Sequence, residues 1–351
     1  MIAPILAAPP ARPGEPSIRP PVKEASMKIH RRALCLMAIA ALAATLLLPS
    51  SLLAQQRRLV TIASGWVVGV YYPLAGAMSR IAYKAKDVNI RATVESSGAS
   101  VANAQLVGSG DADFALLQND IAYYAYNGVT LSAFLGKPVK NMGGVFTIYP
   151  ELVHVVATKA SGIKGIRDLK GKKVVLGPQG SGTEANAIQV MESHGLKVGD
   201  VQAERIDAAA AADQLKDGRV DAAFFTTGLG SAVIVDTFIS GKTVLVPVAG
   251  SEAAALIGKY PFYTAVKVPA NTYKDQAEAQ TVAVMAMMVA RAELPEDLVY
   301  KFTKAIFDDL KQFHEAHSAA KSLTLETALN GMPIPLHPGA DKFFKEKGVK
   351  K

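Results

Sequence analysis

The sequence is poor in the residue types on which many catalytic and nucleic-acid-binding proteins depend. It has one cysteine, Cys35, one tryptophan and only 19% charged residues among its 351 residues. With a single cysteine the chain forms no internal disulfide, and a thiol nucleophile elsewhere in it is excluded. Lysine and arginine form no run that could follow a phosphate backbone, so we expect no nucleic-acid partner. A hydrophobic content of 50% excludes a disordered chain.

Signatures of enzymes are also missing. No Gly-x-Ser-x-Gly nucleophile elbow occurs, and no Gly-x-Gly-x-x-Gly dinucleotide fingerprint follows a predicted strand. Residues 241–243 imitate a phosphate-binding loop, but Asp236 stands where its first glycine is required. His314 and His317 are spaced to share a helix face, yet no further metal ligand accompanies them, and His337 lies between prolines as a structural residue. We therefore predict a protein that is not an enzyme and carries no cofactor or metal.

Residues 1–54 are interpreted as a leader. Residues 1–26 are an upstream extension rich in proline, and residues 27–54 have the pattern of a signal peptide. Basic residues follow Met27, an apolar run covers residues 33–48, and the small Ala54 suits cleavage before Gln55. The alternative is an uncleaved membrane anchor. Export predicts a soluble periplasmic or otherwise extracytoplasmic protein, and the leader also holds six of the basic residues behind the formal charge of +8.

One local pattern occurs three times after the leader. A short apolar strand runs into a loop rich in glycine or serine and then into a helix, with the strands at residues 59–63, 90–95 and 174–176. The helices are expected from about Pro73 to Ala85, from Val101 to Val107 and from Thr183 to Ser193. The start of a helix presents unpaired N–H groups and the positive end of its dipole, which attract a small anion. Alternatively, Ser181 or Thr183 merely caps its own helix.

An internal similarity predicts two α/β domains facing one cleft. A helix, a glycine at its end (Gly110, Gly218) and an apolar strand that ends in polar residues occur in each part of the chain. Residues 152–157 and 262–266 are predicted as the strands that connect the domains. Lobe 1 would then comprise residues 55–157 and 261–351, and lobe 2 would be the inserted residues 158–260. Helix is expected from Pro295 to about Leu325, and the chain is expected to end in a rigid loop and a Lys-rich tail.

Several motifs together resemble one family. The stretches are residues 64–73, 97–103, 118–120, 149–154, 169–184, 221–228 and 335–340, and the similarity extends over about residues 58–348. In this order they resemble the TAXI-type extracytoplasmic solute receptors of TRAP (tripartite ATP-independent periplasmic) transporters. The resemblance implies a two-lobed, type II-like periplasmic-binding-protein fold. It also implies a receptor that delivers a small organic anion, such as glutamate, another amino acid or a carboxylate, to TRAP permease subunits driven by an ion gradient.

The resemblance also supplies candidate ligand contacts, by position. They are loop and helix-start residues of both lobes, together with residues at strand ends. These are Ser64, Gly65, Val70, Tyr71, Ser97, Ala99, Ser100, Gln118, Asp120, Gly180, Ser181, Gly182, Thr183 and Thr226.

The first loop departs from the family pattern. Where the family has small polar residues and glycine, this chain has Trp66, Val67 and Val68, and Ala99 replaces a usual glycine. Trp66, Tyr71 and Tyr72 are expected to cover an apolar part of the ligand. We therefore predict a smaller or more apolar ligand than glutamate, such as an aromatic or branched carboxylate. A periplasmic sensor or adaptor for a signalling protein, or an enzyme on the same scaffold, is the alternative function.

Overall fold

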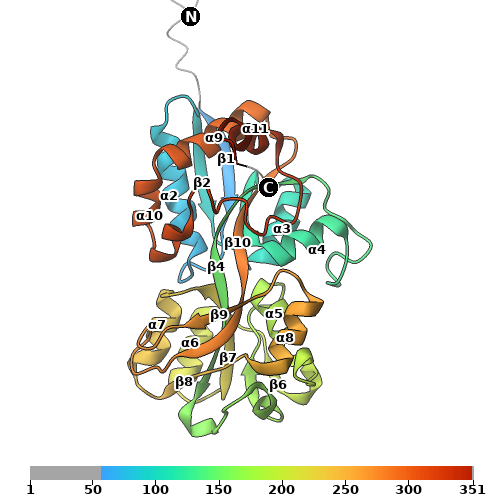
Figure 1. The fold of residues 1–351 in the computed structure, drawn as a ribbon, viewed down its shortest axis with the longest axis vertical. Coiled ribbons are helices and arrows are strands. Elements are labelled where there is room, and N and C mark those ends of the chain that lie inside the picture. The colour runs from blue at the N-terminus through green and yellow to red at the C-terminus, as the bar shows by residue number, and fades with distance from the viewer. Residues whose placement is uncertain (1–56, 350–351) are drawn as a thin grey trace, which may run out of the picture. The chain divides into compact units, whose positions relative to one another are not determined.

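The computed structural model describes residues 57–349 (Figure 1). These residues form one compact unit. The predicted leader lies outside the described residues. Within the described range, no helix has both the length and the apolar character needed to cross a membrane.

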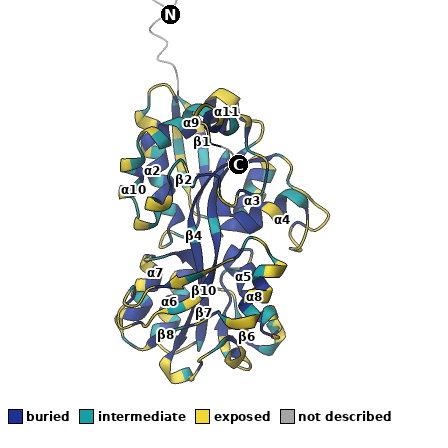
Figure 2. Cartoon of the chain, in the orientation of Figure 1, coloured by how far each residue is buried: buried dark blue, intermediate teal, exposed yellow. Residues whose placement is uncertain are grey.

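Two long antiparallel strands form the centre of a ten-stranded sheet. β4 (Met142–Thr158) and β10 (Ala279–Arg291) pair from Leu152 with Ala283 to Met142 with Arg291. At one end β10 also pairs with β3, and at the other end β4 pairs with β7. The strand order is β2-β1-β3-β10-β4-β7-β5-β6, with β8 on β4 and β9 on β10. Both long strands are buried along most of their length, which explains their nearly continuous apolar sequence (Figure 2).

The unit has two halves, each built around one end of the two long strands. The first half contains three parallel strands and the C-terminal helices. Phe114 of β3 stacks on Phe302 of α9 with ring centroids 4.5 Å apart, so the chain end closes the core formed by its beginning. Gly110 ends α3 with φ +85°, the left-handed conformation predicted for it. The elements of the first half are β1 (Arg58–Ala63), α2 (Tyr71–Lys84), β2 (Ile90–Glu95), α3 (Ser100–Ser109), β3 (Phe114–Gln118), α4 (Asn119–Asn127), α9 (Glu296–Asp308), α10 (Leu310–Glu315) and α11 (Pro338–Glu346).

The second half repeats the α/β pattern. β5 pairs in parallel with β6 and β7, and Gly218 follows α6 with φ +69°. Its own core contains Val174, Val190 and Phe224. The elements are β5 (Lys173–Val175), α5 (Gly182–Ser193), β6 (Gln202–Glu204), α6 (Ala208–Lys216), β7 (Ala222–Gly228), α7 (Ala232–Ile239), β8 (Thr243–Val246), α8 (Gly250–Lys259) and β9 (Thr264–Val268). Short 3-10 turns lie at Lys159–Ser161, Ile166–Leu169, Val198–Asp200 and Ser318–Ser322.

Two local expectations, about the shared strand and about the helix from residue 295, need correction. The second strand shared by both halves is β10, whereas β9, expected at 262–266, pairs only with β10. β9 is largely exposed, while β10 is packed on both faces, and only a doubly buried strand can serve both halves. The expected helix from residue 295 is interrupted at Asp309, which caps α10 instead. The bounds of the two lobes themselves stay a prediction.

Residues Pro338–Glu346 form the helix α11, where a loop and a Lys-rich tail were expected. His337 caps it by accepting from Gly339 N at 3.1 Å, and Pro338 occupies its first turn. Phe343 and Phe344 are buried in the core of the first half. The segment is rich in lysine, but its two phenylalanines pack in the core and hold it there as a helix.

Candidate functional site

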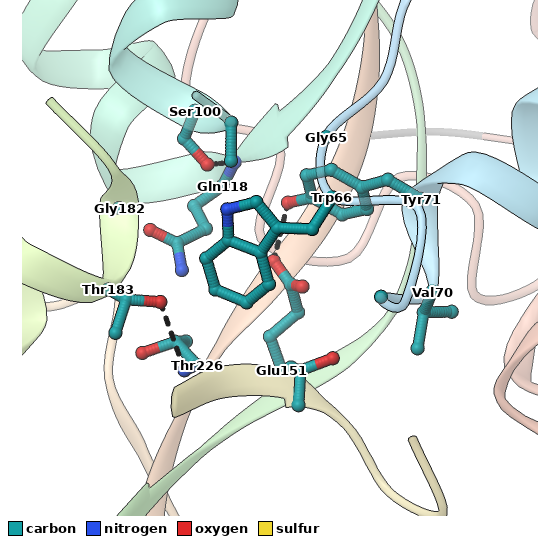
Figure 3. Close-up of a pocket in the computed structure, with 13 residues that line it drawn as sticks. Gly65, Trp66, Val70, Tyr71, Ser100, Gln118, Glu151, Gly182, Thr183 and Thr226 are labelled. Carbon is teal, nitrogen blue, oxygen red and sulfur yellow. Dashed lines mark hydrogen bonds between the residues drawn. The ribbon is translucent and has the colours of Figure 1, made fainter. Parts of the chain in front are cut away.

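A small pocket lies between the two halves, where β1, β3 and β7 end and α2, α3 and α5 begin (Figure 3). Its water-accessible volume is about 20 Å³, room for about one water molecule. Both halves contribute to its wall, and no lysine, arginine or histidine belongs to it. The lining residues are Gly65, Trp66, Gly69, Val70, Tyr71, Ala99, Ser100, Gln118, Glu151, Gly182, Thr183, Thr226 and Thr227.

Three helices start at this pocket, as the repeated sequence pattern predicts. α2 and α3 have no side-chain cap, so the N–H groups of their first turns are not satisfied by a capping residue. In α5 the Ser181 hydroxyl accepts from Glu184 N at 3.1 Å, which makes Ser181 a capping residue and leaves Thr183 to line the pocket. Ser181 therefore caps its own helix, and the binding of an anion at this helix start stays a prediction.

The backbone at Ala99, directly before α3, has an uncommon conformation. Its φ of +74° and ψ of −145° lie in a region that glycine adopts without penalty and that other residues avoid. The TAXI-type receptors usually have a glycine at this position, where this chain has alanine. The structure shows the consequence, which is a strained residue in the pocket wall.

The two halves meet closely at Gly182. A Cβ atom at this position would lie 1.8 Å from Gln118 Oε1, so only glycine fits against this side chain. Gln118 ends β3 of the first half, and Gly182 begins α5 of the second half. The contact therefore joins the two halves at the pocket.

A buried chain of hydrogen bonds links the halves next to this contact. Gln118 Nε2 donates to Asn186 Oδ1 at 3.0 Å, and Asn186 Nδ2 donates to Asp120 Oδ2 at 2.9 Å and to the Tyr263 hydroxyl at 2.7 Å. Tyr263 in turn donates to Gln189 Oε1 at 2.6 Å. Burial raises the pKa of Asp120 to about 7, and its hydrogen bonds to Ile121 N and Asn186 offset only part of that shift.

Glu151 is the acidic group of the pocket. It lies on the long strand β4, opposite both Gly228 of β7 and Val284 of β10, and is 3% exposed. The Tyr71 hydroxyl donates to Glu151 Oε2 at 2.5 Å, and the Tyr149 hydroxyl donates to Oε1 at 3.3 Å. Burial raises the pKa of Glu151 to about 8. The hydrogen bonds from the two tyrosines lower this pKa, and the charge of Asp120 adds a smaller increase. Burial also raises the pKa of Tyr71 well above its usual value, so its hydroxyl stays protonated.

Three buried polar atoms of the lining have no partner within the described residues. They are Trp66 Nε1, Gln118 Oε1 and Thr226 Oγ1. Figure 3 shows the Trp66 indole amid the Gln118 amide, the Thr226 side chain and the Glu151 carboxylate. Buried polar groups are normally hydrogen-bonded, so unpartnered atoms that share a pocket indicate a place for a polar molecule.

Nine of the fourteen residues predicted from the resemblance line this pocket: Gly65, Val70, Tyr71, Ala99, Ser100, Gln118, Gly182, Thr183 and Thr226. Their contact with a ligand stays a prediction. The other five lie outside the lining. Ser64 donates to Glu95 O and Ser97 to Asn103 Oδ1, while Asp120 belongs to the hydrogen-bond chain. Gly180 and Ser181 line a separate cavity beside Arg205.

Sequence reasoning missed Gly69, Glu151 and Thr227 as lining residues. The signal for Glu151 is an acidic residue within an otherwise apolar stretch, which is typical of a buried functional group. Trp66 is in the wall as expected, but Tyr72 is not. Val67 and Val68 are 62% and 38% exposed and lie outside the lining, so of the unusual loop residues only Trp66 changes the pocket.

The histidines have structural partners. His314 Nε2 lies 2.9 Å from Leu323 O, and His317 Nδ1 accepts from Ala319 N at 3.1 Å. His337 Nε2 lies 3.1 Å from Leu294 O and its Nδ1 accepts from Gly339 N. Within residues 57–349 no group of three histidine, cysteine or acidic side chains is placed to hold a metal ion.

A mixed α/β sheet shared by two halves, with a pocket between them, is the type II-like fold of periplasmic binding proteins. The chain is similar to PhnD1 from Prochlorococcus marinus, solved in complex with methylphosphonate, with a TM-score of 0.51, 11% identity and coverage of 75% of this chain and 91% of that one. A protein from Bordetella bronchiseptica RB50 has a TM-score of 0.51 and 18% identity, with 83% of each chain covered. The periplasmic aliphatic sulphonate binding protein SsuA from Escherichia coli has a TM-score of 0.43 and 14% identity over 82% and 83% of the two chains.

The chain belongs to the NMT1-like family, whose model matches residues 62–348.

Proposed function

We propose that this protein is an extracytoplasmic solute-binding receptor of a transporter. It captures a small organic carboxylate or amino acid between its two halves and delivers it to a membrane permease. One observation carries the proposal: a small pocket, lined from both halves, contains unpartnered buried polar atoms and three helix starts. The fold of periplasmic binding proteins and the predicted leader support the same function, and the leader supports a periplasmic location.

The composition of the wall favours an apolar ligand. Trp66 stands in the first loop where the TAXI pattern has small polar residues, and the apolar Val70 and aromatic Tyr71 also line the wall. Because the pocket has room for about one water molecule, a bound organic molecule must displace the Trp66 ring or be enclosed while the halves are apart. We infer that Trp66 moves when the ligand binds.

We further propose that the permease is of the TRAP type, on the motifs of residues 64–73, 149–154 and 335–340. Membrane vesicles containing a candidate permease from the same organism test this assignment. Uptake that requires the receptor and an ion gradient, without ATP, supports a TRAP system. Uptake that requires ATP contradicts it and favours an ABC system. The absence of any uptake together with a ligand-dependent interaction with a sensor kinase would instead support the signalling alternative.

Ligand capture is tested by a thermal-shift screen of residues 55–351 with aliphatic and aromatic carboxylates, amino acids and glutamate. A ligand that binds only the native state raises the melting temperature by mass action. Thr183→Leu, which puts an apolar branched side chain into the wall, is expected to abolish the shift while the unliganded protein stays folded. Ser181→Ala removes only the helix cap and is expected to keep the shift. If no compound raises the melting temperature, the receptor function fails. If Thr183→Leu responds like the wild type, the pocket is not the binding site.

A further inference from the structure

The charge of the pocket is one-sided. Among the described residues of the wall, Glu151 is the only acidic one, and none is basic. Asp120 is connected to Gln118 through Asn186 in the hydrogen-bond chain. Both carboxyl groups are at least 97% buried. None of the ion pairs formed within residues 57–349 involves either of them. A buried acidic side chain is either neutralised by a proton or paired with a cation, and none of the described residues supplies a cation at this site.

The unpartnered atoms also include a surplus of acceptors. The Asp120 carboxylate accepts from Asn186 Nδ2, which fixes Asn186 Oδ1 as the acceptor for Gln118 Nε2. The remaining Gln118 atom is therefore Oε1, an acceptor with no donor. Thr226 Oγ1 is equally without a partner, and the Glu151 carboxylate has acceptor positions beyond those used by Tyr71 and Tyr149.

We propose that Glu151, Gln118 Oε1 and Thr226 Oγ1 form a subsite for a protonated amine of the ligand. An ammonium group has three N–H donors, no acceptor and one positive charge, which matches three acceptors of which one is a carboxylate. The ligand carboxylate then faces the unpartnered Trp66 Nε1 donor and the starts of α3 and α5. This inference rests on the proposed function and narrows its ligand to an apolar amino acid, with Glu151 as the residue that selects for the amine.

Matched ligands that differ only in the amine test the subsite. L-phenylalanine is compared with hydrocinnamate, and L-leucine with isocaproate, by calorimetric titration of the wild type and of Glu151→Gln. The wild type is expected to bind at least one amino acid at least tenfold more tightly than its des-amino partner. Glu151→Gln keeps the size and polarity of the side chain but removes its charge, and is expected to lose this preference. Glu252→Gln, a surface acid on α8, is the control and is expected to keep it.

The outcomes separate the two proposals. If hydrocinnamate and isocaproate both bind as tightly as their amino acids, the amine subsite is overturned and the receptor function stays intact. A preference for the amine that survives in Glu151→Gln also overturns the subsite. If the screen of carboxylates and amino acids yields no ligand at all, the receptor function itself fails.

A measurement on the wild type alone covers the case in which Glu151→Gln does not fold. Since the pKa of Glu151 is about 8 in the unliganded protein, the carboxyl group is mostly protonated at pH 7. An ammonium beside it lowers that pKa, so binding is expected to release up to about one proton per site. Titrations at pH 7 in buffers of different ionisation enthalpy measure this number. Proton uptake, or no proton exchange, overturns the subsite because Glu151 would then stay neutral beside the ligand.

Discussion

Replacing Gly182 by alanine is expected to keep the pocket from closing. The added Cβ would lie 1.8 Å from Gln118 Oε1, 2.4 Å from its Cδ and 3.0 Å from its Nε2, so the whole amide group must move. That movement breaks the 3.0 Å hydrogen bond between Gln118 Nε2 and Asn186 Oδ1. Loss of a buried hydrogen-bond partner costs about 1–3 kcal/mol. Because this contact joins the two halves at the pocket, we expect the cost to fall on the arrangement in which the halves meet.

Ligand affinity should fall accordingly. A loss of about 1–3 kcal/mol in the closed form corresponds to roughly 5- to 150-fold weaker binding. Calorimetric titration with the tightest ligand of the thermal-shift screen measures this factor. A second readout needs no ligand: Trp66 is the only tryptophan of the chain, and opening should hydrate its indole and shift its fluorescence emission to longer wavelength.

Gly258→Ala is the matched control. Gly258 is also a helical glycine of the second half, on α8, and an added Cβ meets no atom within 4 Å. This variant should bind ligand and fluoresce like the wild type. If Gly182→Ala also does so, Gln118 and Gly182 are not in contact in the binding form, and the reasoning about closure is refuted.

Three further outcomes are expected. Ala99→Gly should raise the free energy of unfolding by about 1 kcal/mol, because glycine adopts φ +74° without strain, and a lower value in urea unfolding would contradict the strain. The pKa values of Asp120 and Glu151 are raised to about 7 and about 8, so the folded protein holds protons that the unfolded chain releases above about pH 4. The free energy of unfolding should therefore fall by several kcal/mol between about pH 4 and pH 8, and a flat or rising profile in urea unfolding at each pH would count against the burial of both groups. Trp66→Ser should admit larger and more polar carboxylates, glutamate among them, and an unchanged ligand profile in the thermal-shift screen would show that Trp66 does not limit the pocket.

Local patterns in the sequence determined much of the fold. The strand at Ile90–Glu95 and the helix at Gly182–Ser193 follow from hydrophobic periodicity, and the glycines at 110 and 218 mark the ends of their helices. These features depend on residues close together in the chain. They were sufficient for an α/β protein with helix starts at the ends of strands, whereas the residues that line the pocket were expected from the resemblance to the TAXI-type receptors.

The tertiary structure alone decided which strands are shared and which polar groups meet. β10, rather than β9, pairs along β4, because that choice depends on burial of both faces of a strand by distant helices. Glu151 has no charged partner in its own neighbourhood of the sequence, and only folding places it beside Tyr71, 80 residues away. Likewise Gly182 must be glycine because of Gln118, which belongs to the other half. Contacts between distant segments leave no periodic trace in the sequence, so the acidic character of the pocket emerges only in three dimensions.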